Sequence, residues 1–215
     1  GAFVEVFQKY LDLGYEVLYM GLGSKFSATF SSANVAKQTL DSEDIYLVDS
    51  LNLSSGTGLL VLKASRMVEQ GMTAKEIKEE IEKLVPKVRS QFVIDTLEYL
   101  YKGGRLNALS ALFGGMLRIK PIIKVRDGVM AVGKKGRGNI KNGIDLMLNE
   151  VFQEKDNIDD EFMMITHSLA DKSSEYIKSR LNEEIKVKNL HETPAGCVIS
   201  SHCGKGTIGV LYILK

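Results

Sequence analysis

A glycine- and serine-rich loop is the first stretch of this 215-residue sequence that could do chemistry. Gly21-Leu22-Gly23-Ser24 and the nearby Ser27 stand between an apolar run and a helical pattern. Because the first turn of a helix leaves N–H groups unpaired and carries a partial positive charge, such a loop can bind a phosphate or a carboxylate. Ser24 or Ser27 could instead do no more than cap the helix that follows.

His202 is the second candidate, within the small-residue stretch SSHCGKG at residues 200–206. Small residues let the backbone approach a ligand closely and let the imidazole point across a cleft. One hypothesis is therefore a small-molecule enzyme in which His202 is the acid or base and the Gly/Ser loop binds an anion. The sequence shows no convincing catalytic partner for His202, which could also simply bond a backbone carbonyl.

Arg105 follows the glycine pair Gly103-Gly104, which ends a predicted helix containing Leu97, Leu100 and Tyr101. The arginine is thereby held at a fixed corner, where it could bond the carbonyls of the helix end. The next residues predict a second short helix and then a β-hairpin that turns at Asp127-Gly128. The apolar residues of that second helix are Ala108, Leu109, Leu112 and Phe113.

The sequence disfavours metal, nucleotide and thiol chemistry. His191, Cys197, His202 and Cys203 fall within thirteen residues, but zinc sites favour ligand pairs two to four residues apart, and the adjacent His202 and Cys203 cannot easily bind one ion together. A cysteine nucleophile would need a histidine in contact and an oxyanion hole, of which there is no sign. Neither G-x-G-x-x-G nor a P-loop motif occurs. We therefore expect no metal and no cofactor.

The composition is that of a soluble globular protein, with 44% hydrophobic and 26% charged residues and a formal net charge of +1. This charge argues against general binding of nucleic acid, which needs a concentrated basic surface. No apolar run is long enough for a membrane span, and no secretion signal is evident. Because there are only two cysteines, we expect a reducing compartment and a cytoplasmic protein without integral membrane association.

The order of the predicted elements indicates an α/β protein. Up to residue 95, helical patterns alternate with short apolar runs such as Ile45-Tyr46-Leu47-Val48, which are typical of buried parallel strands. The first half is therefore predicted to form a mainly parallel sheet flanked by helices, with residues 88–94 as a further strand.

The second half reads as ββαβαβ, with an antiparallel hairpin, a strand around residues 185–187 and a final strand at 207–214. This order predicts a mixed sheet with helices. We therefore predict two α/β domains, an N-terminal one at residues 1–114 and a C-terminal mixed one at residues 115–215.

Several blocks of the sequence have a specific order and spacing. The most specific contains Leu97, Leu100 and Gly103-Gly104-Arg105-Leu106, then Leu117-x-Ile119-Lys120-Pro121-Ile122 and Asp127-Gly128. Further blocks are SKFSATF at 24–30, VDS at 48–50 and HCGKG at 202–206. Together these blocks resemble, in the same order, those of the DegV family of bacterial fatty-acid-binding proteins, and the resemblance covers almost the whole chain. It also implies that a βα segment of the family, which precedes the position matching Phe3, is missing, so that the first domain is incomplete.

The resemblance implies that a long-chain fatty acid lies in an apolar tunnel between the two domains. Ser24, Ser27 and His202 would hold its carboxylate, although Ala28 stands where the family usually has glycine. The family is similar to the fatty-acid-binding subunit of bacterial fatty acid kinase, so a separate kinase subunit would phosphorylate the bound acid with ATP. Arg105 would lie near the point of presentation, or would only bond the helix end. The chain itself would be a carrier and not an enzyme.

Two further expectations complete the sequence-based picture. Without the missing segment, a sheet edge would expose unpaired amides and carbonyls, so we expect weaker fatty acid binding and a tendency to self-associate. A purely structural interaction domain is a third hypothesis, but it leaves the serine and histidine stretches unexplained.

Overall fold

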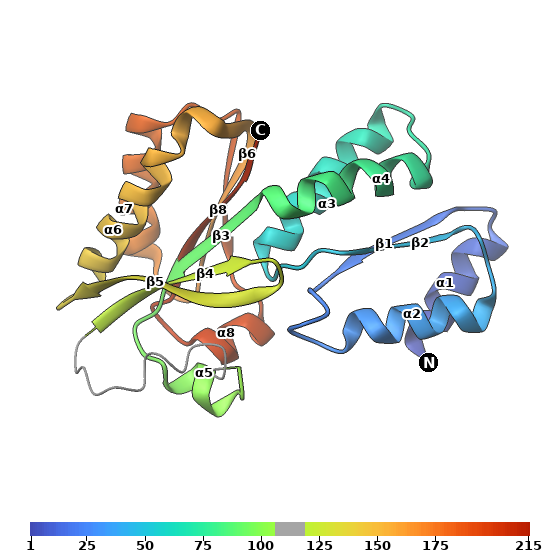
Figure 1. The fold of residues 1–215 in the computed structure, drawn as a ribbon, viewed down its shortest axis with the longest axis horizontal. Helices are drawn as coiled ribbons and strands as arrows, with labels where there is room; N and C mark the ends of the chain where they lie inside the picture. The colour runs from blue at the N-terminus through green and yellow to red at the C-terminus, as the bar shows by residue number, and fades with distance from the viewer. Residues whose placement is uncertain (106–118) are drawn as a thin grey trace.

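The computed structural model describes residues 1–105 and 119–215 (Figure 1). Before the gap lie α1 (Ala2–Asp12), β1 (Val17–Gly21), α2 (Thr29–Leu40), β2 (Ile45–Asp49), α3 (Ser55–Glu69), α4 (Ala74–Leu84), β3 (Val88–Val93) and α5 (Glu98–Lys102). After it lie β4 (Ile119–Arg126), β5 (Val129–Arg137), α6 (Ile140–Gln153), β6 (Ile158–His167), α7 (Asp171–Glu184), β7 (Asn189–Pro194), α8 (Cys197–Cys203) and β8 (Ile208–Leu214). None of the helices in these two ranges is long and apolar enough to cross a membrane.

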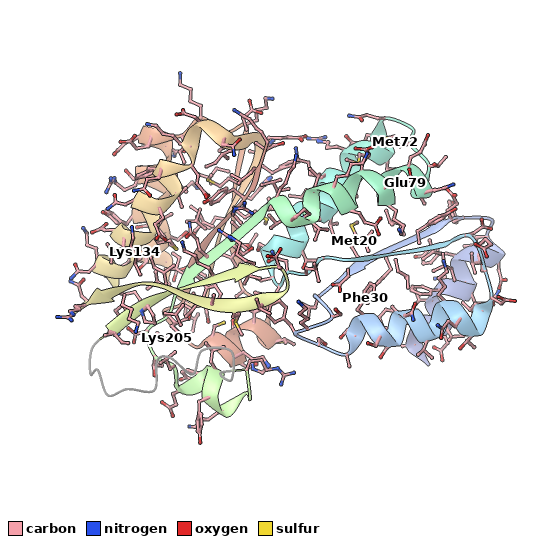
Figure 2. The ribbon with its side chains drawn as sticks, viewed as in Figure 1. Met20, Phe30, Met72, Glu79, Lys134 and Lys205 are labelled. Atoms are coloured by element: carbon pink, nitrogen blue, oxygen red, sulfur yellow. The ribbon has the colours of Figure 1, made fainter. Side chains whose placement is uncertain are left out.

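The smaller sheet, as far as the described residues go, consists of β1 and β2, which run parallel with Val17 opposite Ile45. Its two faces are both covered because successive side chains of a strand point to opposite sides. Tyr19 and Ile45 pack with α1 and α2. Met20 and Val48 pack with α3 and α4, and Met20 lies between this sheet and the α3–α4 pair in Figure 2.

The larger sheet has the strand order β5-β4-β3-β8-β6-β7 within the described part of the chain. Its neighbours are antiparallel except β6 and β7, which are parallel. Helices α6 and α7 cover one face, where Val93, Val210 and Tyr212 contribute to the core. The other face is covered by α3 and α4 at one end and by α5 and α8 at the other (Figure 1). The expected α/β class, with a small parallel and a larger mixed sheet, is confirmed.

The sheet assigned to β3 differs from the expectation. Residues 88–94 were predicted to extend the first, parallel sheet, but β3 lies inside the larger sheet, antiparallel to β4 and β8. Ser90 to Val93 are all buried, as in a central strand of either sheet, so the residues of this strand did not indicate which strands it pairs with.

Two further expectations concern the second half. The prediction of a strand around residues 185–187 is wrong. The strand in this region, β7, begins at Asn189 and is an edge strand that pairs only with β6 among the described residues. Most of its side chains are polar and exposed or half-buried, so no apolar run marks it. The helix predicted through Ala108, Leu109, Leu112 and Phe113 and the predicted domain boundary at residues 114/115 lie outside the described residues. They stay predictions.

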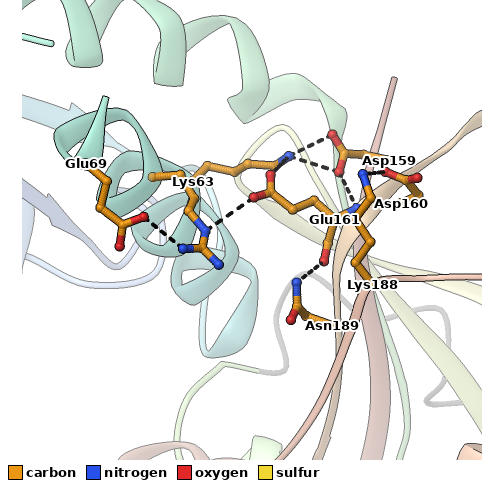
Figure 3. Close-up of polar contacts among 8 residues, drawn as sticks. Lys63, Glu69, Asp159, Asp160, Glu161, Lys188 and Asn189 are labelled. Atoms are coloured by element: carbon orange, nitrogen blue, oxygen red, sulfur yellow. Dashed lines mark hydrogen bonds and ion pairs between the residues drawn. The ribbon is translucent and has the colours of Figure 1, made fainter. Parts of the chain in front are cut away.

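A network of ion pairs joins α3 to β6, and thus joins the layer next to the small sheet to the larger sheet (Figure 3). Lys63 Nζ lies 2.8 Å from Asp159 Oδ2 and 2.6 Å from Glu161 Oε2. Arg66 Nε lies 3.5 Å from Glu161 Oε1, and Asn189 donates to the Glu161 carbonyl across the β6–β7 pair. Burial lowers the pKa of Lys63, but the hydrogen bonds to Asp159 and Glu161 outweigh it and raise the pKa above its ordinary value.

Candidate functional site

Three neighbouring cavities are called inner, middle and outer by their depth below the surface. The middle cavity, of about 100 Å³, lies where the β1–α2 loop, α5, α8 and the β4–β5 hairpin meet. Most of its wall is apolar, and the polar side chains among the described residues that line it are those of Ser27, Arg105 and His202. The remaining lining residues are Leu22, Phe26, Leu53, Phe92, Leu100, Met130, Val198, Ile199 and Cys203.

An inner cavity of about 40 Å³ continues the middle cavity toward the N-terminus of α3 and the end of β6. The two share four lining residues, Leu53, Phe92, Ile199 and Cys203. Burial raises the pKa of Cys203 to about 11, so this thiol stays neutral near pH 7 and acts as part of the apolar wall. The inner and middle cavities therefore adjoin, and the exposed wall of the inner cavity is mostly apolar, although polar residues also line it: Ser54, Ser90, Gln91, Thr166, His167, Ser168 and Thr207.

An outer cavity of about 370 Å³ connects the middle cavity to the surface. It shares Phe26, Arg105 and Met130 with the middle cavity. Its other lining residues among those described are Lys25, Gly104, Gly128 and Val129. The three cavities thus follow one another from the surface inward.

Ser27 sits in the turn before α2. The N–H of Ser27 donates to the Gly23 carbonyl at 3.3 Å, and its hydroxyl lies 2.7 Å from the Thr29 hydroxyl. These two hydroxyls hold two protons and share one hydrogen bond, so one proton remains for a ligand. The N-cap of α2 is Ala28, without a side-chain cap, so neither Ser24 nor Ser27 occupies the expected N-cap position. Ser27 nevertheless accepts the Thr29 N–H at 3.3 Å.

Ser24 is not among the described residues that line the three cavities. Its N–H donates to Asp49 Oδ1 at 3.1 Å, which ties the loop to the end of β2. The structure therefore brings Ser27, His202 and Arg105 together and leaves Ser24 beside them, so the predicted ligand role of Ser24 stays a prediction.

His202 lies near the end of α8, with its ring against Gly103 of the α5 segment. A Cβ at Gly103 would come within 2.1 Å of His202 Nδ1. This nitrogen is buried and has no hydrogen-bond partner among the described residues. The reverse contact is similar, because a Cβ at Gly204 would come within 2.3 Å of the Tyr99 ring. Each helix thus carries a glycine that makes room for a ring of the other.

Arg105 combines the two roles that the sequence left open. The helix α5 ends in a Schellman motif, in which Arg105 N–H donates to the Leu100 carbonyl and Gly104 N–H to the Tyr101 carbonyl, both at 3.0 Å. Gly104 has φ +69°, the left-handed conformation that this motif requires. The Arg105 guanidinium donates to the Gly103 carbonyl at 2.9 Å and also lines the middle and outer cavities.

The loop that carries Ser27 is fixed by residues that the sequence analysis did not assign. The buried Ser50 hydroxyl donates to the Gly21 carbonyl at 2.6 Å, and Gly23 N–H donates to the Asn52 carbonyl at 2.8 Å. A Cβ at Gly23 would come within 2.9 Å of the Asn52 backbone nitrogen. Ser50 of the VDS block and the nearby Asn52 therefore hold the loop in place; the sequence marked the VDS block as part of the family resemblance but gave it no role.

Lys25 was also missed. Its ammonium group donates to the Asp127 carbonyl at 2.9 Å, and its stem packs on Gly128, where a Cβ would come within 3.2 Å of Lys25 Cδ. Asp127 and Gly128 have φ +50° and +74°, as in a tight type I′ turn, at the position where the sequence predicts a turn. The hairpin turn therefore contacts the serine loop, a pairing of distant residues that no local pattern indicates.

The fold and the cavities together define the class: an α/β binding protein whose apolar path, set between sheet and helices, opens through a polar section to the surface. In the described ranges, no group of three or more His, Cys, Asp and Glu side chains is placed to hold a metal ion.

The chain belongs to the DegV family. The model of the family described as "Uncharacterised protein, DegV family" matches residues 1–215. A DegV domain-containing protein of Clostridium acetobutylicum is 38% identical over 213 residues, which cover 99% of this chain and 75% of the relative.

Solved structures share the fold. A DegV family protein from Thermus thermophilus, described by its fatty acid binding, has a TM-score of 0.92 and 26% identity, covering 99% of this chain and 76% of that one. A DegV lipid binding protein from Thermotoga maritima has a TM-score of 0.86 and 26% identity, covering 99% and 74%. The Streptococcus pneumoniae Fatty Acid Kinase (Fak) B3 protein loaded with linoleic acid has a TM-score of 0.82 over 93% and 72%. At 22% identity, this last likeness establishes the fold alone.

Proposed function

We propose that this chain binds a long-chain fatty acid, with the alkyl chain in the inner and middle cavities and the carboxylate beside Ser27 and His202. The observation that carries the proposal is the convergence of Ser27, His202 and Arg105 on one end of a mostly apolar path. An amphipathic ligand with one anionic end matches that distribution. The Thermus and Thermotoga proteins, described as binding fatty acid and lipid, support the same choice of ligand.

The energetics agree with this ligand. Burying an alkyl chain contributes about 0.8 kcal/mol per CH₂, so the tail supplies most of the affinity. A buried carboxylate would be costly without hydrogen bonds. The hydroxyls of Ser27 and Thr29 use one of their two protons in the hydrogen bond between them, which leaves the other proton for the carboxylate. His202 Nδ1 faces Gly103 without a partner, which favours the tautomer with its proton on Nε2, the nitrogen left for a ligand.

The carboxylate end would be presented to a separate kinase. In the reaction, a carboxylate oxygen attacks the γ-phosphorus of ATP, the bond to the β–γ bridging oxygen breaks, and ADP leaves with that electron pair. Arg105, at the rim between middle and outer cavities, would face the transferred group. The chain contributes binding and orientation and no catalytic group. An enzyme built on His202 gains no support, because no described carboxylate is hydrogen-bonded to its ring.

Lipid extraction from the purified protein, followed by mass spectrometry, tests the proposal directly. A fatty acid in about equimolar amount is the expected result, and titration of the delipidated protein with hexadecanoate should show saturable binding. A phosphorylated metabolite in the extract would instead support an enzyme. The absence of both bound lipid and hexadecanoate binding would contradict the proposed function.

A further inference from the structure

The outer cavity carries charge that a fatty acid carboxylate does not need. Among the described residues that line it, Lys25 and Arg105 are cationic and none is acidic. It adjoins the middle cavity through Phe26, Arg105 and Met130, so it lies directly beyond the polar end of the apolar path. A group attached to the carboxylate would extend into it.

Both cations are held in place by backbone carbonyls. Lys25 Nζ donates to the Asp127 carbonyl at 2.9 Å, and Arg105 donates to the Gly103 carbonyl at 2.9 Å. An ammonium group has three donors and a guanidinium five, so each bond to a carbonyl leaves further N–H groups for a ligand. The carbonyls thus orient the cations without neutralising their charge.

The charge of the reaction product matches this arrangement. Phosphorylation converts a carboxylate of charge −1 into an acyl phosphate, a mixed anhydride whose phosphoryl group carries a charge of about −1.5 to −2 and has three acceptor oxygens. Arg105 lines both cavities, whereas Lys25 lines only the outer one. Lys25 therefore adds positive charge just where the additional negative charge would arise.

We propose that the outer cavity is a phosphoryl site, in which Lys25 and Arg105 bind the phosphoryl group of the acyl phosphate formed from the bound acid. The proposal rests on the proposed function and extends it from the substrate to the product. The cavity of about 370 Å³ leaves room for the tetrahedral group and its water. In this site, Lys25 distinguishes the phosphorylated from the free acid.

The test compares three ligands by calorimetric titration of the delipidated protein: hexadecanoate, hexadecylphosphonate as a stable stand-in for the acyl phosphate, and inorganic phosphate. Lys25→Met should weaken hexadecylphosphonate binding about fivefold to twentyfold, a charge-assisted bond reduced by screening in an open cavity. Hexadecanoate binding should change less than twofold. Lys25→Arg should restore the phosphonate affinity, and Lys102→Met, on an exposed lysine paired with Glu98 outside the three cavities, should change neither.

A second pair of variants leaves the bond between Lys25 and Asp127 intact. Val129 is 45% exposed and lines the outer cavity, so Val129→Glu should repel the phosphonate, and Val129→Gln should not. Equal loss of hexadecanoate and phosphonate affinity in Lys25→Met, or no loss in both Lys25→Met and Val129→Glu, would overturn the phosphoryl site. If inorganic phosphate bound as tightly as hexadecylphosphonate, the phosphoryl site would also be overturned, because binding would then not depend on the alkyl chain of the ligand. If hexadecanoate alone failed to bind, the proposed function would be refuted instead.

Discussion

Two contacts join distant parts of this protein, and they differ in kind: one consists of ion pairs and the other of aromatic and imidazole rings packed against glycines. Between α3 and β6, Lys63 is paired with both Asp159 and Glu161 (Figure 3). Between α5 and α8, rings lie on glycines, and His202 Nδ1 has no hydrogen-bond partner within the described ranges. In the first contact, the polar groups are paired with one another. In the second, a polar group has no hydrogen-bond partner among the described residues.

The difference teaches where to look for a binding site. In an ion pair, the attraction between the two charges already offsets their desolvation, so they contribute little to the binding of a ligand. Steric fit of the kind made by Gly103 and Gly204 positions side chains without using their donors or acceptors. Unused hydrogen-bonding capacity beside an apolar cavity, more than charge, therefore marks the candidate site.

The largest expected effect is on the steric contact. Gly204→Ala places a methyl group within 2.3 Å of the Tyr99 ring at a residue with φ +80°, so overpacking and backbone strain act together. Urea denaturation should show a loss of about 3 kcal/mol in the free energy of unfolding. Gly196→Ala is the matched control, because a Cβ there meets nothing within 4 Å. Equal stability of the two variants would mean that α5 and α8 are not held by this fit.

The ion-pair contact should respond next. Lys63→Met leaves Asp159 and Glu161 without their shared cation, and the free energy of unfolding should fall by about 2 kcal/mol. Lys83→Met removes an exposed pair with Glu80 and should cost less than about 0.5 kcal/mol. If hexadecanoate affinity falls in Lys63→Met as much as stability does, the two contacts are not independent.

The same contact predicts a pH dependence. The pKa of Lys63 is higher in the folded protein than its ordinary value, so the folded state binds this proton more tightly than the unfolded chain does. The stabilisation is complete below the ordinary lysine pKa and is lost as the pH rises through the folded one. Denaturation of the wild type at alkaline pH should therefore converge with that of Lys63→Met. A difference that stays constant would contradict the pairing.

Variants of the uncommitted groups should affect binding and not stability. His202→Ala and Ser27→Ala should each weaken hexadecanoate binding by about 1 to 2 kcal/mol, since each removes a hydrogen bond to a charged acceptor. The melting temperature should stay nearly unchanged. Ser24→Ala, on the same loop but outside the cavities, is the comparison variant, and a loss of affinity there would support the ligand role predicted from the sequence.

The smallest expected effect on binding concerns Arg105. Arg105→Ala keeps the backbone bonds of the Schellman motif and removes one side-chain bond to an exposed carbonyl, so stability should fall by less than about 0.5 kcal/mol. Hexadecanoate affinity should change little, but phosphorylation of the bound acid by the proposed partner kinase and ATP should decrease. A large drop in melting temperature would assign Arg105 to the helix end alone.

The sequence predicted local features better than their assembly. The glycine stop after Lys102 and the turn at Asp127-Gly128 follow from backbone conformations that few residues other than glycine adopt. The placement of β3 between β4 and β8 did not follow, because strand partners depend on the whole sheet.

At the candidate site, the family resemblance indicated Ser24, Ser27, His202 and Arg105, and all of these except Ser24 line one cavity. Lys25 and Gly103 gain their roles only through residues far along the chain, Asp127 and His202. No local pattern carries such contacts.

The position of β3 also orders events during synthesis. Val93 pairs with Ile122 and with Ile208, so this strand emerges from the ribosome shortly before β4 and long before β8. At about 5 to 20 residues per second, the wait for β8 lasts several seconds or more. Residues up to α4 can meanwhile assemble around β1 and β2, while the exposed edges of β3 remain open to other chains. Nascent β3 therefore has an edge that can pair with other chains until β8 has been synthesised.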